Sequence, residues 1–152
     1  DPAGFDAEPQ IEALQAWLGR LLAGPELAAA LEQPWAARAA WRSPGWLYHL
    51  ALGPEWQAAR TDGVYRRSTR GRSLEEVGFI HLSNAHQVEA TAALFYGDLP
   101  AGAVLLLTID PQRLAAAGLE VRFELADGGE PFPHLYGPLP LGAVLRAEPW
   151  LR

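Results

Sequence analysis

A near-continuous apolar run at residues 103–109 (AVLLLTI) restricts the fold more than any other stretch of the chain. A strand that is apolar on both faces needs cover on both faces, so this run predicts a central buried strand. Apolar segments bounded by proline and glycine predict further strands at 46–51, 79–83, 119–125 and 143–147. Short helices are predicted between them, at 54–59, 86–95 and 112–117. We therefore expect an α+β domain over residues 46–152 with about five or six strands.

Residues 1–45 are predicted to form a helical extension before this domain. Apolar residues between Ile11 and Leu22 fall at helical spacing, and Pro25 and Pro34 delimit two further helical pieces, at 27–32 and 35–41. The extension carries three tryptophans and few polar groups, so it should pack on the main domain or on a partner chain. A homo-oligomer formed through these N-terminal helices is one expectation.

Composition excludes several classes of protein. The net charge of −6 over 152 residues argues against general binding to nucleic acid or to anionic membranes. No apolar run approaches the length of a membrane span, and no signal-peptide pattern is present, so we expect a cytoplasmic protein. Cysteine is absent, which excludes disulfides and cysteine-ligated metals. The histidines form no H-x-x-x-H pair, so no metal is expected.

Histidines supply the candidate chemistry. His81 stands in the string GFIHLS, between the strand predicted at 79–83 and the helix predicted at 86–95, where a helix N-terminus favours an anion. His49 and His134 also lie among apolar neighbours. Each is either a satisfied structural group or a functional one, and three of them raise the chance that at least two share a site. Ser83 either contacts a substrate or caps the helix.

The arginines at 66–72 and Glu124 each allow a structural and a functional interpretation. Four arginines fall within residues 66–72 and predict either a solvated polar loop or a phosphate clamp, because guanidinium groups bind phosphate bidentately. Glu124 lies on a predicted strand, opposite in face to Phe123 and Leu125, where it is either a solvent-facing carboxylate or part of a site. Tyr65 and Tyr136 read most simply as core aromatics with a polar handle.

Several of these segments together resemble a bacterial family known as domain of unknown function family 952. The matching strings, in order, are YHL at 48–50, GFIHLS at 78–83, Glu124, and FPHLYGPL at 132–139. The resemblance covers residues 46–149, and residues 1–45 lie outside it. The family is distantly similar to the ADP-ribosyltransferase fold, in which small splayed β-sheets with short helices flank a cleft for NAD.

The resemblance implies an NAD-dependent ADP-ribosyl-transfer enzyme whose acceptor is unknown, with NAD as its substrate and no metal. It implies catalytic roles for His49, His81, Glu124 and His134. It implies ligand contacts from Tyr65, Arg67, Arg70, Ser83 and Tyr136, with Arg67 or Arg70 on the pyrophosphate. The alternative is a non-catalytic module that binds a nucleotide or another small molecule on the same fold.

Overall fold

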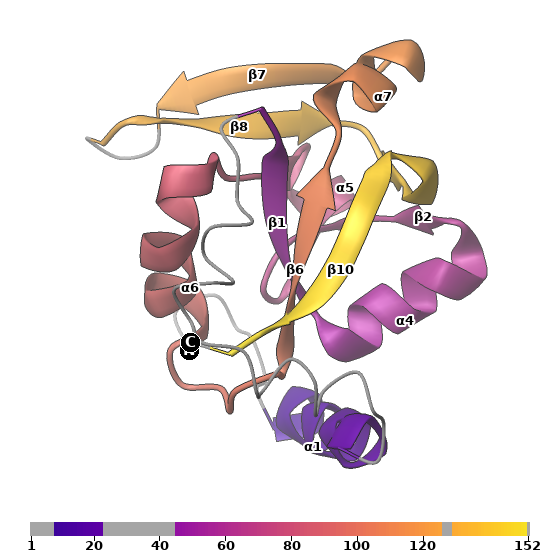
Figure 1. Ribbon diagram of the computed structural model, residues 1–152, viewed down its shortest axis with the longest axis vertical. Coiled ribbons are helices and arrows are strands. Elements are labelled where there is room, and N and C mark those ends of the chain that lie inside the picture. The colour runs from indigo at the N-terminus through magenta and orange to yellow at the C-terminus, as the bar shows by residue number, and fades with distance from the viewer. Residues whose placement is uncertain (1–7, 23–44, 126–128, 152) are drawn as a thin grey trace.

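A computed structural model describes residues 8–22, 45–125 and 129–151 of the protein. Its centre is a three-stranded antiparallel sheet in the order β1 (Leu47–Leu52), β6 (Val104–Ile109) and β10 (Val144–Trp150) (Figure 1). Every residue of β6 is buried, so the apolar run forms the central strand, which confirms the prediction.

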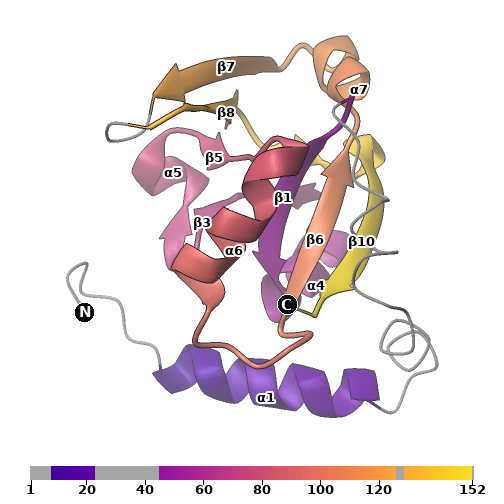
Figure 2. The ribbon, with the colours of Figure 1, turned by 60° about the vertical axis from the view of Figure 1, so that its left-hand side comes forward.

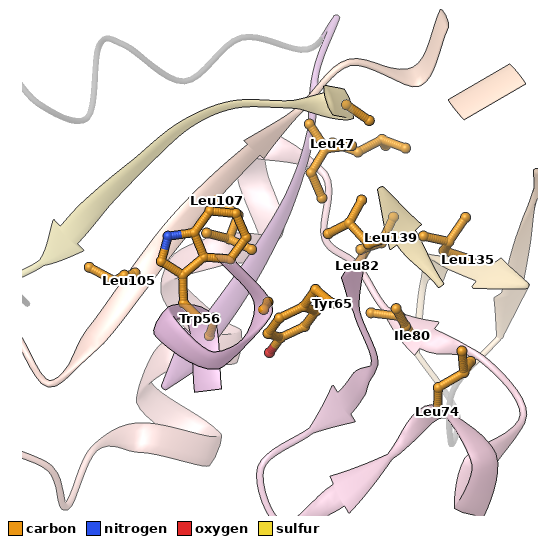
Figure 3. Packing of buried hydrophobic residues seen from close by; sticks show 14 of the residues in the cluster. Leu47, Trp56, Tyr65, Leu74, Ile80, Leu82, Leu105, Leu107, Leu135 and Leu139 are labelled. Atoms are coloured by element: carbon orange, nitrogen blue, oxygen red, sulfur yellow. The ribbon is translucent and has the colours of Figure 1, made fainter. Parts of the chain in front are cut away.

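The two faces of β6 pack into two separate apolar clusters. Leu105 and Leu107 pack with Trp56 of α4 (Gly53–Asp62), as the close-up in Figure 3 shows. Leu106 packs on the opposite face with Val88 of α6 (Val88–Tyr96). Strand alternation therefore divides one apolar run between two layers, and one helix covers each face of the sheet.

A second antiparallel sheet lies next to the first, in the order β5 (Ile80–His81), β8 (Pro131–Tyr136) and β7 (Glu120–Leu125) (Figure 2). The two sheets meet where Tyr48 and Ser83 exchange backbone hydrogen bonds of 2.9 and 2.7 Å. Small separate antiparallel sheets with short helices confirm the predicted α+β class.

The remaining elements are short. They are β2 (Val64–Tyr65) paired with β9 (Leu139–Pro140), β3 (Arg67–Thr69) paired with β4 (Arg72–Ser73), α5 (Leu74–Val77), α7 (Pro111–Ala116) and the 3₁₀ turns η1 (Ala85–Gln87) and η2 (Leu141–Ala143). Ser73 and Glu76 form the reciprocal capping box that their spacing predicts.

Two sequence-based expectations were wrong. The polar loop expected at 67–72 is a hairpin that turns at Gly71, where φ is +77°. The described residues contain ten strands, more than the five or six expected, because β3, β4, β8 and β9 were not predicted as strands, and β4 and β9 have only two residues each. A two-residue strand is too short to show alternation and is defined by its partner.

Helix α1 (Glu8–Leu22) runs along one end of the central sheet (Figure 2). Its Leu14 and Trp17 are 1% and 2% exposed, and they join the α6-side and α4-side clusters respectively. The first predicted helix therefore packs on the domain itself. The pieces predicted at 27–32 and 35–41 lie outside the described residues. None of the described helices is long and apolar enough to cross a membrane.

Candidate functional site

A pocket of about 220 Å³ lies beside the line where the two sheets meet, with α6 as one wall. Its apolar lining consists of Leu50, Leu82, Ala90, Leu94, Phe95, Tyr96 and Phe132. Its polar lining consists of His49, Ser68, Thr69, His81, Ser83, Thr91 and His134. Among the described residues, no Asp, Glu or Arg lines it, so histidines are the only titratable side chains with a physiological pKa that this part of the chain brings to the pocket.

Glu124 and His134 form a hydrogen-bonded pair across the β7–β8 ladder. His134 Nδ1 lies 2.9 Å from Glu124 Oε1, and the Tyr136 hydroxyl donates to the same oxygen at 2.5 Å. The bond from Tyr136, followed by that from His134, lowers the pKa of the Glu124 carboxyl. Because an ionised carboxylate only accepts, His134 Nδ1 carries the proton.

The other nitrogen of His134, a residue that lines the pocket, is buried and has no partner among the described residues. His134 is 5% exposed, and its Nε2 has no hydrogen bond from any described residue. Phe79 stacks on the ring at a centroid distance of 3.9 Å and an angle of 16°, which fixes the plane of the imidazole. With the proton on Nδ1, a neutral ring presents Nε2 as a buried acceptor, and such atoms usually find a partner.

His81 lies directly opposite His134 on the neighbouring strand. The two rings meet edge to face at 5.1 Å and 85°. Burial, together with the nearby His134, lowers the pKa of His81 to about 4, so its ring is neutral at pH 7. The site thus holds two adjacent imidazoles at an aromatic wall formed by Phe79.

His49 uses both of its ring nitrogens inside the protein. Nδ1 donates to the backbone oxygen of His81 at 2.6 Å, which leaves Nε2 to accept from the Tyr65 hydroxyl at 2.9 Å. Burial is the largest effect on His49 and lowers its pKa to about 4. His49 therefore fixes the backbone of His81 and has no free nitrogen for a ligand.

Two serines line the pocket in different ways. Ser83 connects the sheets through its backbone bonds to Tyr48. Ser68 is fully buried, and its Oγ has no hydrogen-bond partner among the described residues. Two of the lining residues thus hold a buried polar atom without a partner among the described residues, Ser68 Oγ and His134 Nε2. The sequence predicted Ser68 in a polar loop, as an added donor to a phosphate, and did not indicate the apolar wall of α6.

The arginines do not line this pocket. Three of the four are paired with carboxylates: Arg66 with Glu75 at 3.4 Å, Arg67 with Glu55 at 3.1 Å, and Arg70 with Asp98 at 2.6 and 3.0 Å. Arg70 lies nearest to the pocket, because it also donates to the backbone oxygen of Phe95, a wall residue, at 3.0 Å. The structure therefore brings the three histidines together and leaves Arg67 apart.

No three histidine or carboxylate side chains in the described part of the chain lie close enough to hold a metal ion. The groups at the pocket can accept protons, orient hydroxyls or amides, and enclose a flat apolar ring. A carboxylate that orients one imidazole nitrogen and leaves the other free is an arrangement suited to proton transfer.

The fold and the pocket define a small α+β domain with a histidine-lined site between two antiparallel sheets. The chain belongs to the family described as protein of unknown function (DUF952), whose sequence model matches residues 51–147. His81, Glu124 and His134 lie within that match, and α1 lies outside it.

Solved structures of one bacterial protein are similar to this chain. The crystal structure of protein CC0527 from Caulobacter crescentus is 31% identical, with a TM-score of 0.56, and the match covers 68% of this chain and 84% of that one. The solution NMR structure of CC0527 matches with a TM-score of 0.53 and covers 82% of that chain. No curated protein matches the chain.

Proposed function

We propose that the protein is a cytoplasmic enzyme that binds an NAD-class nucleotide and breaks the bond between its nicotinamide and ribose. The observation that carries the proposal is the buried Nε2 of His134, a pocket-lining residue beside His81, which has no hydrogen-bond partner among the described residues while Glu124 orients its ring. The apolar lining of the pocket suits a flat heterocycle, and the imidazole of His134 suits a ribose hydroxyl or an attacking acceptor.

The size and lining of the pocket support one ring and its sugar as the enclosed part of the ligand. A volume of about 220 Å³ is below the roughly 300–1,000 Å³ of pockets that enclose a whole drug-sized ligand. Leu82 and Phe132 offer apolar surface to a pyridine ring, and Ser68 Oγ offers a polar contact to its carboxamide. The adenylate half would then extend outside the pocket.

Glu124 and His134 divide the chemistry between them. When the C1′–N1 bond breaks, nicotinamide leaves with the bonding electron pair and the ribose gains positive charge, which the ionised Glu124 stabilises from behind His134 without contacting the ribose. The acceptor oxygen then bonds to C1′, and its proton passes to His134 Nε2. His49 acts as a positioning residue, because its two nitrogens hold His81 and Tyr65.

The pyrophosphate contact is assigned to Arg70. Its guanidinium is bound by Asp98 at the edge of the pocket, so pyrophosphate has to displace that carboxylate. Asp98→Asn removes the competing charge and is expected to tighten NAD binding several-fold in calorimetry. If Arg70 only anchors α6, the same substitution leaves NAD affinity unchanged.

One observation favours the alternative of a non-catalytic binding module. No carboxylate of the described residues lines the pocket, and Glu124 reaches it only through His134. A pocket of this kind suits recognition of a neutral ring without any bond being broken.

The test measures binding and turnover separately. Thermal unfolding is measured with NAD, ADP-ribose, AMP and nicotinamide, each added in turn. A ligand present at 100 times its dissociation constant is expected to stabilise the fold by about 2.7 kcal/mol. Nicotinamide release is then followed for the wild type, for Glu124→Gln and for His86→Gln. His86 pairs with Glu130 at the surface and does not line the pocket, so it serves as the matched control.

Loss of release by about 100-fold or more in Glu124→Gln, with the control unchanged, supports the enzyme. Binding of NAD without release in the wild type supports the binding module. Absence of stabilisation by all four ligands at millimolar concentration removes the proposed NAD site.

A further inference from the structure

Strand β7 presents an apolar edge to solvent. It is the last strand in the order β5-β8-β7, and among the described residues no strand pairs with its outer side (Figure 1). Phe123 and Leu125 are 58% and 74% exposed. A six-residue edge with exposed aromatic and aliphatic side chains readily pairs with another strand.

The register of the sheet shows which backbone groups of β7 are free. Phe123 lies opposite Pro133, whose carbonyl oxygen accepts from the backbone of Leu82 on the other side of β8. That carbonyl points away from β7, so Phe123 and Pro133 form a non-hydrogen-bonded pair. The N–H and C=O groups of Phe123, and by alternation those of Val121 and Leu125, therefore point toward the open edge.

The sequence of this edge is complementary to itself. Residues 121–125 read Val-Arg-Phe-Glu-Leu. When two copies lie antiparallel about Phe123, Val121 faces Leu125, Arg122 faces Glu124 and Phe123 faces Phe123. Every apolar residue thus meets an apolar residue, and both charged pairs are attractive. Such cross-strand pairs each contribute about 0.2–1 kcal/mol.

We propose that a second copy of this chain pairs with β7, antiparallel and centred on Phe123, and joins two three-stranded sheets across a two-fold axis. The outward backbone groups of residues 121, 123 and 125 meet their counterparts in this register. The partner's Arg122 then lies opposite Glu124, beside the carboxylate that orients His134. Each copy thus adds a guanidinium to the site of the other.

Neighbouring registers are less favourable. A pairing centred on Arg122 sets two arginines opposite each other and Glu120 opposite Glu124, so like charges meet in every polar pair. A pairing centred on Val121 brings Glu120 to Arg122 but leaves Leu125, the more exposed apolar residue, outside the interface.

One pair of six-residue strands makes an interface at the small end of specific contacts, so the dimer is expected to be weak and concentration-dependent. Sedimentation equilibrium of the full chain, from micromolar to millimolar concentration, should show a shift toward twice the monomer mass of 16.5 kDa. A wild type that stays monomeric over this range overturns the proposal. Binding of a different protein, and not of a second copy of this chain, to the edge of β7 also overturns it.

Charge substitutions test the register. Arg122→Glu sets two carboxylates opposite each other at both ends of the interface and should weaken association about tenfold or more. Combining it with Glu124→Arg reverses both charges and should restore the dimer. Loss in the single variant without recovery in the double variant overturns the pairing centred on Phe123.

Two further variants locate the interface. Phe123→Pro removes the outward N–H, which β8 does not use, and should abolish the dimer while circular dichroism shows the native fold. Ile11→Glu alters an exposed position of α1, 38% accessible, and should leave the dimer intact. Association that is lost in Ile11→Glu and kept in Phe123→Pro assigns the contact to the N-terminal helix instead. The interface does not depend on the proposed NAD chemistry.

Discussion

Acidification should destabilise the protein through buried histidines, and the contribution of His49 can be measured separately. His49 is 4% exposed, and its ring donates to the backbone of His81 and accepts from Tyr65. A second proton on Nε2 would place a charge in this buried space and remove the acceptor that Tyr65 uses. Burial accordingly lowers the pKa of His49 from 6.5 to about 4 in the folded chain.

The size of the effect depends on that difference in pKa. The unfolded chain binds the proton near pH 6.5 and the folded chain only near pH 4, so stability is complete above about pH 6.5 and falls as the pH drops toward 4. A tenfold difference in proton affinity is worth 1.36 kcal/mol, so His49 removes about 3 kcal/mol across this window. Below about pH 4 the protonation of His49 lowers the free energy of unfolding no further.

Urea unfolding measured at several pH values between about 7 and 4 gives the free energy of unfolding directly. His49→Gln removes the titrating group, so its stability should fall less steeply, by about 1.4 kcal/mol per pH unit compared with the wild type. Carboxylates and His81 titrate in both proteins, so the difference between the two curves reports on His49. Parallel curves for the wild type and His49→Gln would show that folding does not lower the pKa of His49.

Three further measurements test the packing, and a fourth tests a helix cap. Tyr65→Phe leaves Nε2 of His49 without its donor and should cost about 1–3 kcal/mol in urea unfolding; no loss would show that the bond is not needed. Trp17→Ala should cost about 3–5 kcal/mol, and a loss below about 1 kcal/mol would mean that α1 does not pack as described. Gly53→Ala places a methyl group 2.3 Å from the Trp17 ring, so its cost should shrink in the Trp17→Ala background. Ser73→Ala should cost about 1 kcal/mol through loss of the helix cap, and an unchanged midpoint would contradict that.

Local patterns were sufficient for the elements whose own residues define them. The apolar run of β6 requires cover on both faces, and the pairing of Ser73 with Glu76 marks a helix start in any context. Hairpin β3–β4 could not be predicted this way, because the only buried side chain of β3 is Ser68, a polar residue. Its strand character comes from its neighbours rather than from alternation of its own sequence.

The site was accessible to sequence reasoning only in part. His49, His81 and His134 could be named as candidates because each is a polar residue among apolar ones. Their different roles could not, since all three have similar local sequences. The difference lies across the strand: Tyr65 meets His49, whereas Glu124 takes one nitrogen of His134 and leaves the other free.

The junction between the sheets explains why these roles belong together. Strand β5 has only two residues, so its position depends on its contacts on either side. On one side His49 holds the backbone oxygen of His81, and on the other His81 pairs with His134. A shift of either sheet therefore changes the separation of the His81 and His134 rings. His49, which offers no nitrogen to a ligand, sets that separation through a bond of 2.6 Å, and the site depends on it as much as on the groups that face the pocket.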